Sequence, residues 1–347
     1  MSSSENRLEL KLLDNLRRSR DRISEERERR QTQLDIPLSF GVKFLDQCLG
    51  GICPNDLILL GAKTGIGKTQ LASIAAMTNA AAGKRVCFFA LEAEPNEIES
   101  RITYQMLADV YYKLLRKDFP NIHLNYMDWY NGCFKDSLGK VEEEIEALQK
   151  DMYPDLWTYY RSGDFTIQEF EQKFMAMKDQ TDLFVIDHLH YFDFEDENEN
   201  RAMKATVKKI RDLAILFGKP IILVAHLRKS DKRTRQIAPD LDDFHGSSDI
   251  TKIATKVITL APGPQGKSIG NKWPTYMRVG KCRVDGSRTK LIGLNIFNAD
   301  VNKYHDYYYL GRLYPAEDKF EPITNLNEIP HWAKSAQIYE ESIGWFK

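Results

Sequence analysis

The stretch Gly61-Ala62-Lys63-Thr64-Gly65-Ile66-Gly67-Lys68-Thr69 decides the fold. It follows the apolar run 57–60 and leads into the alanine-rich segment 70–76. A buried strand, a glycine-bearing loop and a helix in this order are the setting of a phosphate-binding loop. The backbone N–H groups of residues 64–68 are then expected to point at the phosphates of a nucleotide, and the helix N-terminus adds partial positive charge.

This prediction assigns roles to particular residues. Lys68 is expected to reach the β and γ oxygens of ATP, and Thr69 is expected to ligate Mg²⁺. The loop departs from the strict pattern G-x-x-x-x-G-K-[ST], because Ala62 stands five positions before Gly67 and the nearest glycine is Gly61. A glycine-rich turn without a ligand is the alternative. The predicted nucleotide contacts are Ala62, Lys63, Thr64, Gly65, Ile66, Gly67, Lys68, Thr69 and Gln70.

Length and composition limit the classes of protein. The chain has 347 residues, of which 42% are hydrophobic, enough for one large α/β domain or two modest ones. Apolar runs such as 221–225 are far too short to span a membrane, and the polar start is no signal peptide, so a cytoplasmic protein is expected. Five scattered cysteines without C-x-x-C spacing indicate reduced thiols. A net charge of −1 means that any attraction to nucleic acid must be local.

Three predicted strands end in a polar residue. Glu92 follows the strand 85–91, Asp187 ends the strand 182–187, and His226 follows the strand 221–225. Carboxyl ends of parallel strands are where ligands bind in open α/β sheets. Glu92 is therefore expected to polarise the attacking water, Asp187 to hold Mg²⁺ opposite Thr69, and His226 to sense the γ-phosphate. A solvated Glu92 is the alternative for that residue. The neighbouring His188 and His190 fit either metal ligation or an ordinary polar strand end.

Two clusters of basic residues remain. The loop 228–235 has no apolar periodicity and carries Arg228, Lys229, Lys232, Arg233 and Arg235, which suits contacts with nucleic-acid phosphates; the alternative is a solvated loop. The runs 276–283 and 291–297 flank the turn 285–287 and predict a β-hairpin. Lys281 and Arg283 alternate on its first strand, so both are expected on one face, where they could complete a neighbouring subunit's nucleotide site as an arginine finger does.

The other segments are less informative. Residues 5–33 are dense in charge with a narrow leucine stripe, which fits a solvated helix or one that docks on a second copy of the chain. Residues 95–181 contain two helical patterns, 98–110 and 141–152, and many aromatic side chains that form a core or a surface for a protein partner. No motif is recognisable in residues 314–347.

The order of these motifs resembles the RecA-like motor domain of DnaB-type replicative helicases, over about residues 34–310. That family also accepts alanine at the first phosphate-loop position. His226, followed by Gly246-Ser247-Ser248, looks more like the compact RepA-type hexameric helicases of plasmids. The resemblance implies an α/β P-loop NTPase with a mainly parallel sheet flanked by helices, a C-terminal β-hairpin and a helical insertion. It makes Lys68 and Thr69 the Walker A pair, Glu92 the catalytic base, Asp187 the Walker B acid, residues 228–235 a DNA-contacting loop, and Lys281 and Arg283 a basic pair acting in trans.

These expectations combine into one prediction. Residues 1–33 form a charged helix or linker, residues 34–313 a RecA-like ATPase domain with a helical aromatic insertion at about 103–178, and residues 314–347 an extension. The predicted function is a Mg²⁺-dependent ATPase that assembles as a ring, taken as a hexamer, and moves on single-stranded DNA as a helicase. The alternatives are a RecA- or KaiC-like ATPase that regulates assembly without unwinding, and a nucleotide-binding interaction protein. The resemblance leaves two features unexplained: the aromatic insertion, and the lack of a counterpart to the primase-recruiting domain of DnaB.

Overall fold

The computed structural model describes residues 19–32, 38–194, 198–228, 238–244, 248–263, 272–314, 319–323 and 325–333. The chain divides into two compact units, residues 1–37 and residues 38–347. In the first unit the described residues form helix α2 (Ser19–Thr32), whose sequence is almost entirely charged or polar. The predicted leucine stripe of this segment lies outside the described residues. No helix in the described part of the chain is long and apolar enough to cross a membrane.

The second unit is built on a ten-stranded sheet with the order β10-β9-β8-β7-β6-β1-β5-β4-β2-β3. Strands β6, β1, β5, β4, β2 and β3 run parallel to one another. Strands β6, β7, β8, β9 and β10 pair antiparallel, each with the next. The predicted α/β class with a mainly parallel sheet at the phosphate loop is therefore confirmed. The strands are β1 (Leu57–Ala62), β2 (Val86–Ala90), β3 (Leu156–Tyr160), β4 (Leu183–Asp187), β5 (Ile221–His226), β6 (Lys256–Pro262), β7 (Lys272–Cys282), β8 (Leu291–Asn298), β9 (Lys303–Tyr314) and β10 (Lys319–Pro322).

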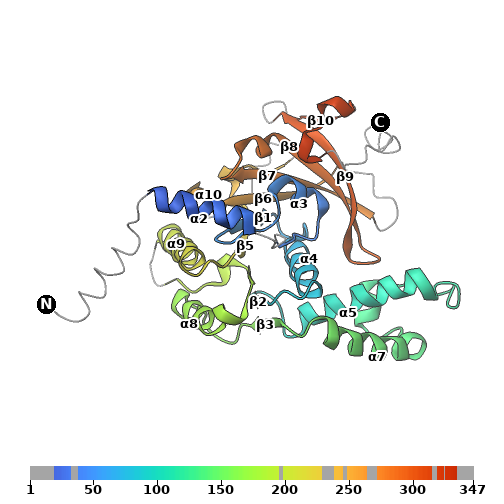
Figure 1. Ribbon diagram of the computed structural model, residues 1–347. Helices are drawn as coiled ribbons and strands as arrows, with labels where there is room; N and C mark the ends of the chain where they lie inside the picture. Colours follow the sequence, from blue (N-terminus) through green and yellow to red (C-terminus); the bar gives the residue numbers. More distant parts are fainter. Residues whose placement is uncertain are drawn as a thin grey trace. The chain divides into compact units, whose positions relative to one another are not determined.

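Helices cover both faces of the parallel half of the sheet. Figure 1 shows α8 and α9 on one face and α4 on the other. Every residue of β1 is buried, as expected for a parallel strand covered on both faces. The helices of this unit are α3 (Lys43–Leu49), α4 (Lys68–Ala81), α5 (Glu97–Val110), α6 (Tyr126–Tyr130), α7 (Lys135–Met152), α8 (Ile167–Met177), α9 (Glu199–Phe217) and α10 (Ser248–Ile253), with a π-helical turn at Tyr111–Leu115.

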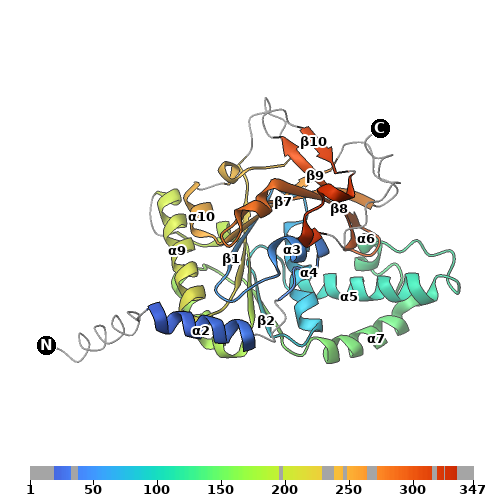
Figure 2. The same ribbon diagram turned by 45° about the horizontal axis from the view of Figure 1, so that its top comes forward.

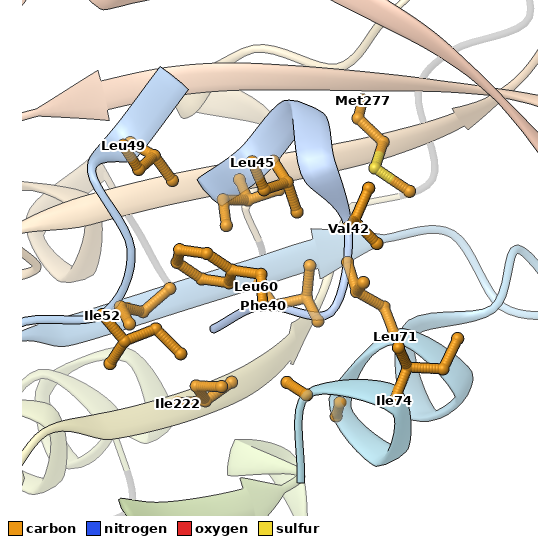
Figure 3. Packing of buried hydrophobic residues seen from close by; sticks show 14 of the residues in the cluster. Phe40, Val42, Leu45, Leu49, Ile52, Leu60, Leu71, Ile74, Ile222 and Met277 are labelled. Carbon is orange, nitrogen blue, oxygen red and sulfur yellow. The ribbon is translucent and has the colours of Figure 1, made fainter. Parts of the chain in front are cut away.

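Alternate residues of β1 enter two separate cores. Ile58 and Leu60 pack with α3 and α4, whereas Leu57 and Leu59 pack with α8 and α9. Figure 3 shows the first core, where Leu45 of α3 and Leu71 of α4 approach Leu60. Because β1 is anchored on both faces, the loop that follows it starts from a fixed position.

Helices α5, α6 and α7 form an arm with its own aromatic core, visible at the side of the sheet in Figure 2. Tyr104 lies at its centre and contacts Tyr126 and Trp129, with ring centroids 5.2 and 5.5 Å apart. The two helical patterns predicted from sequence correspond to α5 and α7. Residues 103–178 are not helical throughout, because they also contain β3, which pairs with β2 and extends the main sheet.

The predicted hairpin is confirmed, since β7 pairs antiparallel with β8. The antiparallel part of the sheet is larger than predicted, because β9 pairs with β8 and β10 pairs with β9. These two strands were not predicted from sequence.

Candidate nucleotide-binding site

The loop 63–67 joins β1 to α4, as predicted. Gly65 and Gly67 have φ angles of 80° and 96°, in a region that side-chain-bearing residues rarely adopt. The Lys68 side chain is largely buried under the loop, and its Nζ donates a hydrogen bond to the Lys63 carbonyl at 3.4 Å. Burial lowers the pKa of Lys68, while the charges of Asp187 and Glu92 oppose that shift. The lysine therefore lies in the electrostatic field of both predicted acidic residues.

The structure gives a physical reason for the displaced glycine of this loop. A Cβ atom on Gly61 would lie 2.3 Å from Cζ of Phe244. The Phe244 ring therefore occupies the space that a side chain at position 61 would fill. Ala62, one position later, is completely buried and belongs to the core under α4. The departure from the strict pattern therefore reflects how the end of β1 packs.

Asp187 ends β4 with its side chain almost fully buried. Burial raises the pKa of Asp187, and a hydrogen bond from the Thr69 hydroxyl acts in the opposite direction. Its Oδ1 atom has no hydrogen-bond partner among the described residues. A buried carboxylate oxygen without a partner, beside a threonine hydroxyl at the phosphate loop, fits the oxygen ligands that Mg²⁺ prefers. Asp187 and Thr69 are thus brought together as the sequence predicted.

Glu92 follows β2 and lies beside the end of β4. The backbone N–H groups of Leu91 and Glu92 both donate to the carbonyl of Asp187, at 2.7 and 3.2 Å. The Glu92 carboxylate lies 2.9 Å from Nε2 of His188, and 42% of its side chain is exposed. The contact with His188 is the main cause that lowers the pKa of Glu92, and the charges of His226 and Lys68 act in the same direction. Glu92 is therefore ionised at neutral pH and accessible to water.

His226 ends β5, in register with Ala62 of β1. Its ring lies 4.1 Å from the ring of His188, centroid to centroid. One donor atom each from Glu92, His188 and His226 lie within 4.8 Å of one another. The structure thus brings both predicted residues, Glu92 and His226, to one place and adds His188 between them. From sequence, His188 fitted metal ligation or an ordinary polar strand end, and its contact with Glu92 was not predicted.

Gln70, which was predicted to contact the nucleotide, has a buried side chain with two partners in the protein. Its Nε2 donates to the carbonyl of Asn302 at 2.6 Å, and its Oε1 accepts from Arg101 at 3.1 Å. Asn302 lies in the turn between β8 and β9, and Arg101 lies on α5. Gln70 therefore connects the first turn of α4 to the antiparallel strands and to the arm.

Lys281 and Arg283 lie near the amino ends of the parallel strands β6 and β1, whereas the phosphate loop follows the carboxyl end of β1. Strand β7 runs antiparallel to β6 and ends where β6 begins, and the first residue of β6, Lys256, is in register with Ile58 near the start of β1. Nζ of Lys281 donates to the carbonyls of Thr251 and Lys252 at 2.8 and 2.7 Å, whereas Arg283 is exposed. This chain's own phosphate loop therefore does not include the pair.

The predicted DNA-contacting loop can be described only at its start. Arg228 is exposed, and its backbone N–H donates to the Asp243 carbonyl at 2.6 Å. Lys229, Lys232, Arg233 and Arg235 lie outside the described residues, as do Gly246 and Ser247.

A phosphate loop after β1, with acidic residues after β2 and at the end of β4 of one parallel sheet, defines a P-loop NTPase with a RecA-like fold. The family model of the DnaB-like helicase C terminal domain matches residues 38–286, well over half of the chain, and the chain belongs to this family. It is accordingly an ATP-hydrolysing enzyme of the replicative helicase family.

Solved structures agree on the fold. One, described as an ATPase domain, matches with a TM-score of 0.61 and 16% identity, over 82% of this chain and 97% of that one. A structure described as a DnaB-like replicative helicase and its interactions with primase matches with a TM-score of 0.61 and 16% identity, over 83% of this chain and 66% of that one. At this identity the likeness concerns the fold alone. A search of curated protein sequences finds no match.

Proposed function

We propose that this protein is a Mg²⁺-dependent ATPase that assembles as a ring, expected to be a hexamer, and translocates along single-stranded DNA as a helicase. The observation that carries the proposal is the convergence of Lys68, Asp187 and Glu92 at the carboxyl edge of neighbouring strands. Lys68 lies in the field of both carboxylates, and Asp187 offers, beside Thr69, a buried oxygen that has no partner in the described part of the chain. This is the arrangement that transfers a phosphoryl group to water.

Each residue has a defined task in this proposal. The N–H groups of the loop and the N-terminus of α4 bind the phosphates, and Lys68 neutralises charge on the β and γ oxygens. Thr69 and Asp187 would hold Mg²⁺, which supplies charge neutralisation across the β- and γ-phosphates when bound. Glu92 accepts a hydrogen bond from the attacking water and orients it, and His226 contacts the γ-phosphate or its product.

The exposed Arg283 acts on the nucleotide of a neighbouring subunit. Its position at the far edge of the sheet supports this role, because an arginine finger acting in trans must point away from its own phosphate loop. Lys281, bound to two carbonyls of α10, keeps the end of β7 in place beside that helix. Ring assembly is required for turnover in this scheme.

Single-stranded DNA is the proposed substrate track. The support is family membership and the five basic residues within residues 228–235, which suit contacts with a phosphate backbone. The test is steady-state ATP hydrolysis with and without single-stranded DNA, on the wild type and on a variant in which Arg228, Lys229, Lys232, Arg233 and Arg235 are alanine.

We expect stimulation of the wild type by DNA, loss of that stimulation in the variant, and unwinding of forked DNA by the wild type. ATP hydrolysis that is indifferent to DNA, with no unwinding, would favour the RecA- or KaiC-like regulatory ATPase instead.

A further inference from the structure

His188 has a buried imidazole ring to which the proposed function assigns no role. Only 2% of its side chain is exposed. Its two ring nitrogens have different partners: Nδ1 accepts a hydrogen bond from the backbone N–H of His190 at 3.2 Å, and Nε2 lies 2.9 Å from Oε2 of Glu92. The ring is therefore held between the backbone after β4 and the carboxylate that we propose as the base.

The backbone contact determines where the imidazole proton lies. A neutral imidazole has one N–H group, and a nitrogen that accepts a hydrogen bond cannot carry it. Because Nδ1 accepts from His190, the proton of neutral His188 is on Nε2, which faces Glu92. Among the described residues Nε2 makes no hydrogen bond of full geometry, either to Glu92 or to another acceptor. Glu92 is the partner within hydrogen-bond reach, and such contacts commonly tighten when substrate binds.

We propose that His188 is a positioning residue for hydrolysis, whose Nε2–H group holds one oxygen of the Glu92 carboxylate so that the other oxygen orients the attacking water. This inference rests on the role of Glu92 given under the proposed function. The side chain of Glu92 is 42% exposed and begins two residues beyond the end of β2, so without a partner it would sample several rotamers. A fixed donor reduces this freedom, and a well-oriented base is what the reaction requires.

The side chains of Glu92, His188 and His226 could be taken for a transition-metal site, since two imidazoles and a carboxylate are common ligands of zinc. The hydrogen bond of His188 argues against that assignment. A histidine that binds metal presents an unprotonated nitrogen to the ion and donates its other N–H to an acceptor. Here Nδ1 accepts from a donor, so the nitrogen facing Glu92 carries the proton.

A packing role alone would also account for burial. The His188 ring contacts the rings of His226 and Tyr191, with centroids 4.1 and 4.8 Å away. Packing depends on the size of the side chain, whereas positioning depends on a donor at the place of Nε2. The two roles therefore predict different results for substitutions that keep or remove the donor.

The test is a double-mutant cycle of His188→Leu and Glu92→Gln, together with His188→Gln, which restores an N–H donor. His123→Leu, at an exposed site, is the matched control. We measure kcat for ATP hydrolysis, the Kd of a fluorescent ATP analogue and the circular dichroism spectrum of each variant. His188→Leu should lower kcat by about 10–100-fold, the range typical of a residue that supports a reacting ligand, with the analogue Kd changed by less than about threefold.

Two further results are expected. His188→Gln should recover to within about fivefold of the wild-type kcat, and His188→Leu should lower kcat by less than about threefold when Glu92 is already glutamine. Equal losses from His188→Leu in both backgrounds, or a glutamine variant no better than leucine, would overturn the inference and leave the role of Glu92 intact. Full turnover of Glu92→Gln alone would instead refute the proposed base. One equivalent of Zn²⁺ bound by the wild type and lost in His188→Gln would make the cluster a metal site and overturn positioning.

Discussion

Replacing Lys256 with methionine should destabilise the fold strongly, because this lysine is the cation of a buried ion pair. Its Nζ lies 2.6 Å from Oδ2 of Asp56 and 2.8 Å from the carbonyl of Gly51. The side chains of Lys256 and Asp56 are 2% and 9% exposed. Asp56 immediately precedes β1 and Lys256 begins β6, so the pair joins the two strands at the edge opposite the phosphate loop.

The size of the effect follows from what remains around Asp56. Removing one partner of a buried pair typically costs about 3–5 kcal/mol, because the other charge is left uncompensated. Asp56 would still accept from the Cys53 backbone N–H at 2.9 Å and from the Thr255 hydroxyl at 2.8 Å. Methionine keeps most of the packing volume. We therefore expect a loss near the lower end, about 3 kcal/mol in the free energy of unfolding.

The assay is urea unfolding followed by tryptophan fluorescence and circular dichroism. The matched control is Lys204→Met, which removes a pair of similar length, 2.7 Å to Asp249, between side chains that are 52% and 34% exposed. An exposed pair contributes at most about 1 kcal/mol, so the control should shift the midpoint far less. Equal shifts for the two variants would refute the argument from burial. Asp56→Asn combined with Lys256→Met should recover part of the loss, since no buried charge then remains.

Three further predictions concern the site. Gly61→Ala should lower the free energy of unfolding by about 1–3 kcal/mol, because its Cβ would lie 2.3 Å from Phe244, and Phe244→Leu should relieve that loss in urea unfolding. Asp187→Asn should raise the Mg²⁺ concentration for half-maximal hydrolysis by at least about tenfold, with metal-free ATP binding retained in calorimetry. Arg283→Ala and Lys68→Ala should each be inactive alone but hydrolyse ATP when mixed, because a mixed ring contains interfaces with both residues; no recovery would refute action in trans.

The sequence predicted the four parallel strands that carry the site, β1, β2, β4 and β5. These strands are continuous apolar runs that end in a loop or a polar residue, as buried parallel strands do. Lys68, Thr69, Asp187 and Glu92 meet because carboxyl ends of parallel strands share one edge of a sheet. Position in the chain was sufficient for that inference.

Other elements had no comparable signal. Strand β3 lies at the edge of the sheet. Its residues 156–160 are half-buried or exposed, and three of them are aromatic, a pattern that fits a loop, a helix or an edge strand equally well. Strand β9 likewise has a polar and aromatic sequence that gives no clear alternation over residues 303–309. Both strands form because a neighbouring strand offers backbone groups for hydrogen bonding. That neighbour is set by the tertiary structure and is not visible in the local sequence.

Long-range packing also decided details of the site that spacing could not. Phe244 explains the glycine at position 61, although 183 positions separate the two residues in the sequence. The contact between His188 and Glu92 joins the ends of two strands, and Gln70 is tied to Asn302 and Arg101 from distant segments. Neither the periodicity of one element nor the position of strand ends in the chain indicates these contacts.

The arm has a structural connection to the nucleotide site that sequence did not suggest. Tyr104 donates to the carbonyl of Asp300 at 2.7 Å, and Nζ of Lys303 lies 2.6 and 2.8 Å from the two carboxylate oxygens of Asp109. The turn between β8 and β9 is thereby fixed to α5. The same turn accepts the hydrogen bond from Gln70 beside the phosphate loop.

The central claim is that Lys68, Asp187 and Glu92 form one ATP-hydrolysing site that is coupled to single-stranded DNA. It is tested most directly by the steady-state hydrolysis rate of the wild type and of Glu92→Gln, each with and without single-stranded DNA, with ATP binding measured in parallel. We predict a wild-type rate that DNA stimulates, and a Glu92→Gln rate at least about 100-fold lower with ATP affinity unchanged. A Glu92→Gln enzyme that hydrolyses ATP at the wild-type rate would contradict the account.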